Sequence, residues 1–222
     1  MKKIIIAVAA LFCATALLAQ DIPDNDWAGF NRYAKANTEV SAKPLAVLMG
    51  DSITDGWFSQ DQDFFKENNL LGRGISGQVT SHMVVRFRRD VVDHHPKYVV
   101  ILAGINDIAR NNGYISLEDT FGNIVSMCEI ARANKIKPVL CTLVPSAYIK
   151  WRPALKDTKE QVARLNAMIR DYAKAKHYKL VDYATVLADA KGETRSDLSG
   201  DSVHPNLAGY KLMEEALMKV IK

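Results

Sequence analysis

The sequence of 222 residues predicts one α/β domain of the doubly wound, flavodoxin-like kind, with three α/β/α layers around a mainly parallel five-stranded sheet. Short apolar segments alternate with amphipathic helical patterns along the chain, which is typical of β-α units. The clearest apolar segments are continuous, as in strands that are buried on both faces. No linker, internal repeat or low-complexity segment divides residues 20–222, so we expect one domain there.

Five segments are predicted to be strands. The first, 45–49, is a run of apolar residues between Pro44 and Gly50. The clearest is 97–103, with the sequence Lys-Tyr-Val-Val-Ile-Leu-Ala. The other three are 70–75, which Gly72 and Gly74 weaken, then 137–143 and the short 179–181.

The segments between these strands have helical patterns. Residues 21–43 are polar with scattered apolar positions and are expected to form a lead-in helix over the sheet. Ser116 opens a helix with a variant of the capping box, and apolar residues follow at helical spacing as far as Cys128. Further helices are expected over 80–90, 157–177 and 207–221, with a loop over 144–155.

The composition is that of a globular protein, because 48% of the residues are hydrophobic and 24% are charged. The formal net charge is +4. The basic residues form no block and do not alternate with aromatic residues, so no nucleic-acid partner is predicted. The oligomeric state is left open.

Residues 1–19 have the pattern of a secretory signal peptide. Two lysines precede an apolar stretch that ends at Ala19, and this stretch is short for a membrane span. Lipid attachment at Cys13 is disfavoured by the bulky residue before it and by the very short leader. We therefore expect cleavage after Ala19, export to the periplasm or the exterior, and a mature chain without a membrane span.

Two cysteines, Cys128 and Cys141, remain after the leader. An exported location permits a disulfide between them, but two buried free thiols fit the sequence at least as well. Two cysteines without zinc-ligand spacing give no metal framework. We expect neither a metal nor a cofactor.

Gly50-Asp51-Ser52 follows the first predicted strand directly. Ligands of open α/β sheets bind beyond the carboxyl ends of the strands, and Gly50 permits a tight turn there. Ser52 is therefore a candidate nucleophile. Glycine, aspartate and serine are also common turn residues, so a plain turn is the alternative.

Polar residues follow the predicted strands at four places, namely at Ser52, at Gly77, at Asn106 and at Asp201 with His204. The carboxyl ends of parallel strands lie at one edge of the sheet, so these residues are expected to converge. Acyl transfer needs such a set: a hydroxyl nucleophile, an imidazole base, a carboxylate that orients the base, and donors for the oxyanion.

His204 is the preferred base because Asp201 lies three residues before it, within reach through a local turn. Pro205 also restricts the backbone of His204. The remaining histidines are read as solvated or structural: His82, His94, His95 and His177.

Four short motifs resemble the four sequence blocks of the GDSL, or SGNH, hydrolase family. They are Gly50-Asp51-Ser52-Ile53, Gly77 within Gly-Ile-Ser-Gly-Gln-Val-Thr, Gly104-Ile105-Asn106-Asp107, and Asp201-Ser-Val-His204-Pro205. Each is weak alone, but all four occur in the family's order between residues 45 and 210. Together with Thr54 and Trp57 they are most similar to the branch of platelet-activating-factor acetylhydrolase-like esterases and bacterial carbohydrate acetylesterases. The departures are Ile53 in place of Leu and Gly72 in place of the Asn of many members, and neither removes a catalytic atom.

The resemblance implies a role for each matching residue. Ser52 is the implied nucleophile, His204 its base, and Asp201 the carboxylate that orients the base. The implied oxyanion hole consists of the backbone N–H groups of Ser52 and Gly77 and the side-chain amide of Asn106.

These observations together predict an exported, metal-independent serine esterase that removes short acyl groups, mainly acetyl, from small or carbohydrate substrates. Tyr148 and Trp151 in the long loop, with Trp57 across the site, are expected to form an aromatic rim for substrate, although Trp57 also fits a core position. One alternative is a lysophospholipase or thioesterase for longer acyl chains. The other is a non-catalytic carbohydrate-binding module on the same fold.

Overall fold

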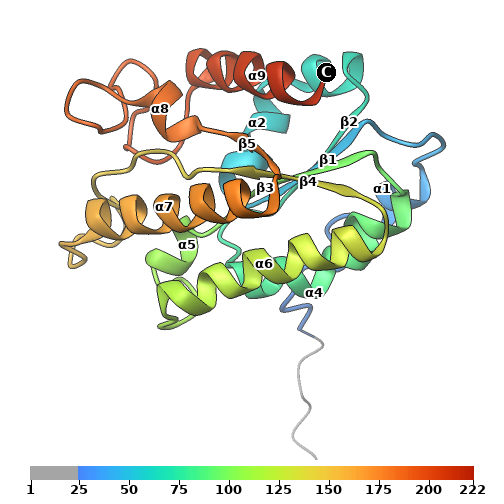
Figure 1. Cartoon of the computed structure of the whole chain (residues 1–222), viewed down its shortest axis with the longest axis horizontal. Coiled ribbons are helices and arrows are strands. Elements are labelled where there is room, and N and C mark those ends of the chain that lie inside the picture. Colours follow the sequence, from blue (N-terminus) through green and yellow to red (C-terminus); the bar gives the residue numbers. More distant parts are fainter. Residues whose placement is uncertain (1–24) are drawn as a thin grey trace, which may run out of the picture.

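The computed structural model describes residues 25–222, so the expected leader over 1–19 lies outside the described residues. Its centre is a parallel five-stranded sheet with strand order β2-β1-β3-β4-β5 (Figure 1). This arrangement confirms the predicted doubly wound fold, and its order is that of flavodoxin-like sheets. The strands are β1 (Ala46–Gly50), β2 (Leu70–Gly74), β3 (Tyr98–Leu102), β4 (Lys137–Cys141) and β5 (Lys179–Val181).

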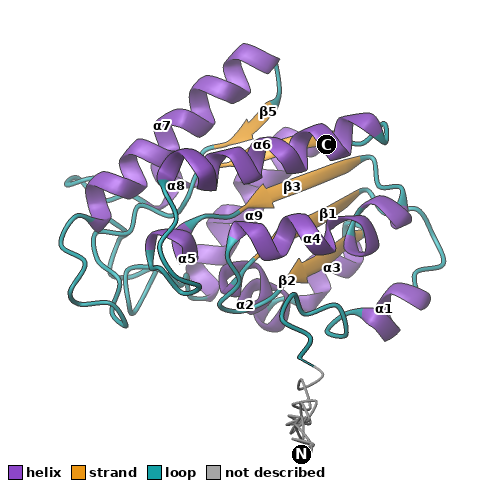
Figure 2. Ribbon diagram, turned by 90° about the horizontal axis from the view of Figure 1, so that it is seen from below, coloured by secondary structure: helices purple, strands orange, loops and turns teal. Residues whose placement is uncertain are grey.

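Helices cover both faces of the sheet, as right-handed crossovers between parallel strands require (Figures 1 and 2). On one face lie α2 (Ser52–Gln60) and α9 (Leu207–Ile221). On the other face lie α4 (Thr80–Asp90), α6 (Leu117–Ala133) and α7 (Thr158–Lys176). The short elements are α1 (Ala34–Thr38), α3 (Gln62–Glu67), the 3₁₀ turn η1 (Val92–His94), α5 (Ile105–Ile108) and α8 (Tyr183–Leu187).

The core lies on both faces of β1 and β3, in which every residue is buried. Their continuous apolar sequence therefore fits the layered fold, because a central parallel strand has no solvent side. Cys128 on α6 and Cys141 on β4 are both buried and free. The structure thus has the two free thiols, one of the two states that the sequence allowed.

The lead-in segment differs from the expected helix over 21–43, since only α1 is helical in its described part. Asp26 accepts hydrogen bonds from the backbone N–H groups of Phe30 and Asn31, at 2.8 and 2.6 Å. Such a side chain satisfies the backbone donors of a turn in place of a helix. Tyr33 joins this segment to the sheet, because its hydroxyl donates to the Gly74 carbonyl.

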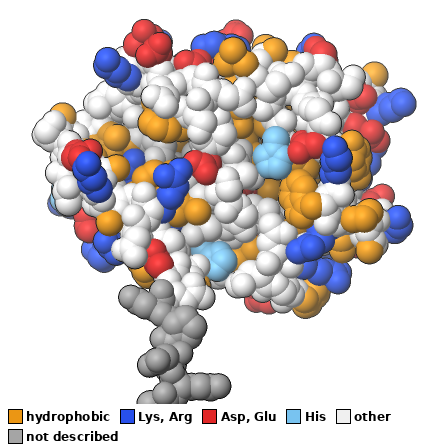
Figure 3. All heavy atoms as spheres, turned by 180° about the vertical axis from the view of Figure 1, so that it is seen from behind, with side chains coloured by type: hydrophobic (Ala, Val, Ile, Leu, Met, Phe, Trp, Pro, Cys, Tyr) orange, Lys and Arg blue, Asp and Glu red, His pale blue; other side chains and the backbone are white. Residues whose placement is uncertain are grey.

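Opposite charges are interspersed over the surface seen from behind in Figure 3. Between residues 25 and 222, none of the helices is long and apolar enough to cross a membrane.

Candidate active site

Ser52 lies at the junction of β1 and α2, which leaves no room for a side chain at Gly50. A Cβ atom at Gly50 would lie 2.1 Å from Thr54 Oγ1 and 2.9 Å from the Leu102 carbonyl oxygen. Asp51 caps the new helix, because its Oδ1 accepts the Ile53 N–H at 3.0 Å. Ser52 is thus the first residue of α2, and the N–H groups of a first turn have no partner within their helix.

Ser52, His204 and Asp201 form a continuous chain of hydrogen bonds. Ser52 Oγ lies 2.8 Å from His204 Nε2, and His204 Nδ1 lies 2.7 Å from Asp201 Oδ2. The carboxylate can only accept at neutral pH, so Nδ1 carries the proton and Nε2 is left to accept from the hydroxyl. This tautomer is the one in which an imidazole can take a proton from serine.

Asp201 is held in its charged form by the turn that it begins. Its Oδ1 accepts the backbone N–H groups of Val203 and His204 at 3.0 and 2.7 Å. Partial burial tends to raise the pKa of Asp201, but the hydrogen bonds from His204 and Val203 outweigh it and hold the pKa below the usual value. The carboxylate of Asp201 is therefore ionised at neutral pH.

The Asp201–His204 turn is fastened to two neighbouring segments through Ser202. Ser202 adopts a left-handed backbone conformation, with φ of 70°. Its Oγ accepts the Ala147 N–H at 3.2 Å, and its carbonyl accepts the Thr194 hydroxyl at 2.9 Å. These contacts hold a strained conformation that places the Asp201 and His204 side chains on one short turn.

Asn106 is a buried residue of α5, the short helix that follows the end of β3. One N–H of its amide donates to the Gln78 carbonyl at 3.1 Å, and its Oδ1 accepts from Asn111 Nδ2 at 2.7 Å. Both contacts fix which end of the amide carries the nitrogen. Among residues 25–222, the second N–H of the amide has no hydrogen-bond partner.

Gly77 lies in the exposed turn after β2 with φ of 80°, a conformation that favours glycine. The turn adjoins the Ser52 junction, because the Ile75 N–H donates to the Gly50 carbonyl at 3.2 Å. Through Gln78 it also adjoins Asn106. The structure therefore brings the Gly77 turn together with the segments that carry Ser52 and Asn106.

Trp57 is not part of an aromatic rim, and this expectation was wrong. Its side chain is 1% exposed, stacked between Phe64 and Tyr210 with ring centroids 5.7 and 5.6 Å away. Its indole N–H donates to Glu214 Oε1 at 3.1 Å. Trp57 follows Ile53 by one turn of α2, so the helix directs both into the core against α9.

The other two aromatic residues remain near the surface. Tyr148 is half exposed, whereas Trp151 is partly buried and its ring lies 5.6 Å from the imidazole of His204. The Trp151 indole N–H donates to Asn111 Oδ1 at 3.2 Å. Asn111 thereby joins Trp151 to Asn106, a contact that no sequence motif indicated.

Asp107 is a second buried residue whose position sequence reasoning did not explain. It accepts hydrogen bonds from the N–H and hydroxyl of Thr80, at the start of α4. Burial raises its pKa to about 6, and the Thr80 hydrogen bonds oppose that rise. Asp107 therefore fastens the Asn106 segment to the helix that follows the Gly77 turn.

The other four histidines have structural surroundings. His82 Nδ1 accepts the Val79 N–H at 3.3 Å, and His94 Nε2 lies 3.0 Å from Asn37 Oδ1. His95 and His177 have left-handed backbones at the ends of η1 and α7. Over residues 25–222, no group of three or more His, Cys, Asp or Glu side chains is arranged to hold a metal ion.

Comparison with known proteins shows which sequences and solved structures this chain is similar to. The solved structure of a GDSL-like lipase from Bacteroides thetaiotaomicron VPI-5482 is 41% identical, with a TM-score of 0.83 over 87% of this chain and 97% of that one. The lipoprotein YqeF of Bacillus subtilis is 30% identical over 74% of this chain and 81% of its own length. An acetylxylan esterase of Geobacillus stearothermophilus is 23% identical over 68% of this chain and 71% of its own length.

The family model for GDSL-like lipases and acylhydrolases matches residues 48–212, a range that contains Ser52, Gly77, Asn106, Asp201 and His204. The matched range covers most of the α/β domain, from β1 to the first turns of α9. The protein is therefore a carboxylic ester hydrolase, and the chain belongs to the GDSL-like lipase/acylhydrolase family.

Proposed function

We propose that this protein is an exported serine esterase that removes acetyl and other short acyl groups from carbohydrates and small alcohols. The observation that carries the proposal is the chain from Ser52 Oγ through His204 to Asp201, with contacts of 2.8 and 2.7 Å. A serine hydroxyl is a weak nucleophile until a positioned base takes its proton.

In the proposed reaction, His204 Nε2 accepts the Ser52 proton as Oγ bonds to the ester carbonyl carbon. The carbonyl π electrons move to its oxygen, which the Asn106 amide and the N–H groups of Ser52 and Gly77 stabilise. The oxyanion then collapses, the C–O bond to the alcohol breaks, and His204 returns its proton to the departing oxygen. Water, deprotonated by His204, repeats the sequence on the acyl-enzyme and releases the acid.

The preference for short acyl groups is supported by the shortness of two connections at the site. Ser52 follows β1 with one intervening residue, and α5 begins three residues after β3 ends. Neither connection has room for the inserted loops that usually wall a long acyl trench. The acetylxylan esterase relative acts on an acetylated carbohydrate by its name, which supports the same substrate class.

Export is supported by the sequence of residues 1–19 and by the likeness to the lipoprotein YqeF. A charged beginning, an apolar middle and a small residue at the cleavage point are the features of a secreted chain.

Active-site labelling tests the proposal. A fluorophosphonate should modify Ser52 alone, because an unactivated hydroxyl reacts far more slowly. Mass spectrometry locates the adduct, and Ser52→Ala should lose both labelling and hydrolysis of p-nitrophenyl acetate while keeping its circular dichroism spectrum. Ser202→Ala is unsuitable as a control because Ser202 holds the catalytic turn, so Ser59→Ala on the exposed end of α2 is used. An adduct on another serine, or activity retained by Ser52→Ala, would overturn the proposal.

A further inference from the structure

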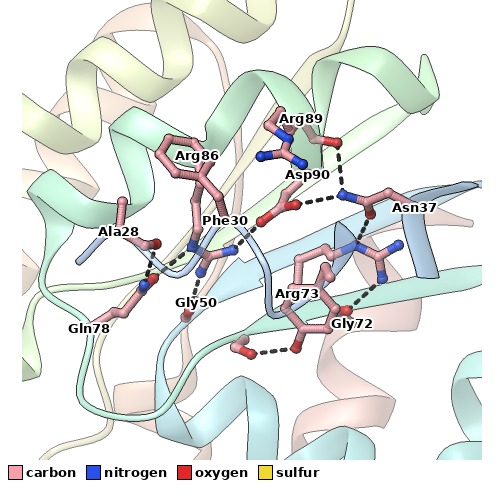
Figure 4. Close-up of polar contacts among 12 residues, drawn as sticks. Ala28, Phe30, Asn37, Gly50, Gly72, Arg73, Gln78, Arg86, Arg89 and Asp90 are labelled. Atoms are coloured by element: carbon pink, nitrogen blue, oxygen red, sulfur yellow. Dashed lines mark hydrogen bonds and ion pairs between the residues drawn. The ribbon is translucent and has the colours of Figure 1, made fainter. Parts of the chain in front are cut away.

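We infer that Arg86 is a positioning residue that sets the relative placement of the Ser52 junction and the Gly77 turn. The inference rests on the proposed function, because it assigns the part of the chain that holds the proposed oxyanion donors in place. Figure 4 shows the Arg86 guanidinium between Gly50, Gln78 and Asp90.

The guanidinium is completely buried, with 0% exposure. Its Nη2 donates to the Gly50 carbonyl at 3.0 Å, and Gly50 precedes Ser52 by two residues. Its Nε donates to Gln78 Oε1 at 2.6 Å, and Gln78 directly follows Gly77. One rigid planar group thus spans the two turns that carry the proposed backbone oxyanion donors, Ser52 and Gly77.

Gln78 extends the influence of Arg86 to the third oxyanion donor. Its backbone carbonyl accepts from Asn106 Nδ2 at 3.1 Å, while its side-chain Nε2 donates to the Ala28 carbonyl at 2.7 Å. The Gln78 side chain is therefore held at both ends, and its main chain carries the contact to Asn106. A shift of Gln78 would displace the Asn106 amide and the Gly77 N–H together.

The charge of Arg86 is neutralised one helical turn away. Asp90 Oδ2 accepts from Nη1 at 2.8 Å, and Asp90 Oδ1 accepts from Asn37 Nδ2 at 2.8 Å. A buried ion pair is a weak source of stability because both charges lose their hydration. Apolar packing would serve the core as well, whereas only a forked donor can join both turns.

Arg73 supplies a matched control within the same network. It is also buried, at 5% exposure, and it donates to Asn37 Oδ1 at 2.9 Å and to the Gly72 carbonyl at 2.8 Å. It has no hydrogen bond to Gly50 or Gln78 among the contacts of the described chain. Arg73→Lys therefore perturbs a buried arginine without touching either turn.

The test compares Arg86→Lys, Arg73→Lys and Gln78→Met with the unmodified full chain, using p-nitrophenyl acetate at a temperature where each variant is folded. Lysine at position 86 keeps the charge beside Asp90 but cannot donate to both turns. We expect Arg86→Lys to lower kcat at least tenfold, with KM within about twofold, because misplaced donors act on the transition state. Arg73→Lys should keep kcat within about twofold, whatever its effect on the unfolding midpoint.

Gln78→Met removes the acceptor while leaving the Arg86–Asp90 pair, so it tests the inference even if Arg86→Lys does not fold. Gln78→Met should lower kcat as Arg86→Lys does. The double variant Arg86→Lys/Gln78→Met should have a kcat only slightly below that of the less active single variant. A wild-type kcat in Gln78→Met, or equal losses in Arg86→Lys and Arg73→Lys, would overturn the inference. Activity retained by Ser52→Ala would instead overturn the proposed function.

Discussion

The indole of Trp151 lies against the imidazole of His204, with ring centroids 5.6 Å apart and planes inclined by 31°. The same indole donates its N–H to Asn111, whose amide in turn donates to Asn106. One side chain of the long loop therefore contacts the proposed base and, through a single intermediate, the proposed oxyanion donor. The loop supports the site in addition to bordering it.

The first prediction concerns the relay, by which we mean the hydrogen bonds from Trp151 through Asn111 to Asn106. Trp151→Phe keeps an aromatic ring beside His204 but loses the N–H, so the Asn111 amide loses a hydrogen bond. A net hydrogen bond contributes about 1 kcal/mol, so Trp151→Phe should lower kcat by a factor of up to roughly five. Asn111→Ala should cost more, because Asn106 Oδ1 then loses its partner directly. Steady-state kinetics on p-nitrophenyl acetate measure both, with the exposed Asn112→Ala as control. Equal kcat values in all three variants would leave the relay without a role.

The second prediction concerns the oxyanion donor itself. Asn106→Ala should lower kcat by about 10²–10³, the usual effect of removing one such donor. KM should change little, because the amide stabilises charge that develops only in the transition state. Asn106→Asp tests the same point with a side chain of equal size that repels an oxyanion. A variant with normal kcat would make Asn106 a structural residue of the loop.

The third prediction concerns acyl length. Each methylene that enters a fitting apolar pocket favours binding by about 0.8 kcal/mol, so an enzyme with an acyl trench improves steeply with chain length. Here we expect kcat/KM to be highest for p-nitrophenyl acetate, lower for the butyrate and close to background for the octanoate. A maximum at six carbons or more would instead identify a lysophospholipase or thioesterase with the same catalytic residues.

The fourth prediction concerns Asp51 and pH. Burial raises its pKa from 3.8 to about 6, and the hydrogen bond from Ile53 opposes that rise. Between these values the folded chain binds a proton that the unfolded chain does not, so stability from this group falls as pH rises from 4 to 6. The loss is about 3 kcal/mol for a shift of this size. Asp51→Asn keeps a capping oxygen but cannot ionise.

Urea unfolding between pH 4 and 7 measures this effect. The variant should lose less free energy of unfolding than the unmodified protein over that range, while the exposed Asp63→Asn should follow the unmodified protein. Parallel curves for Asp51→Asn and the unmodified protein would show that Asp51 ionises normally.

The placement of the site at one sheet edge could be predicted because parallel topology determines it. Ser52 and Asn106 follow strands directly, so identifying the strands located them. The Asp201–His204 contact was predictable for a different reason, since both residues lie on one turn. The packing of residues far apart in the sequence could not be predicted by either route. By sequence, Trp57 fits a core position or a pocket wall, and its packing against α3, α8 and α9 decides between them.

The supporting residues were the least accessible to sequence reasoning. Arg86 lies three residues after Met83 on the inner face of α4, where a charged side chain contradicts the apolar pattern. That contradiction is a signal, because a buried arginine needs acceptors, and besides Asp90 on its own helix Arg86 finds them at Gly50 and Gln78. Asn111 offered no such signal, since an asparagine in a loop is ordinary.

The proposed base and the proposed nucleophile are separated by 152 positions along the chain. The Tyr210 hydroxyl on α9 donates to the Ile53 carbonyl at 2.8 Å, directly behind Ser52. During synthesis, Ser52 therefore emerges long before His204, the proposed base. In the proposed mechanism hydrolysis needs His204, which lies near the end of the chain, so the order of synthesis delays activation of the Ser52 hydroxyl until most of the domain has been made.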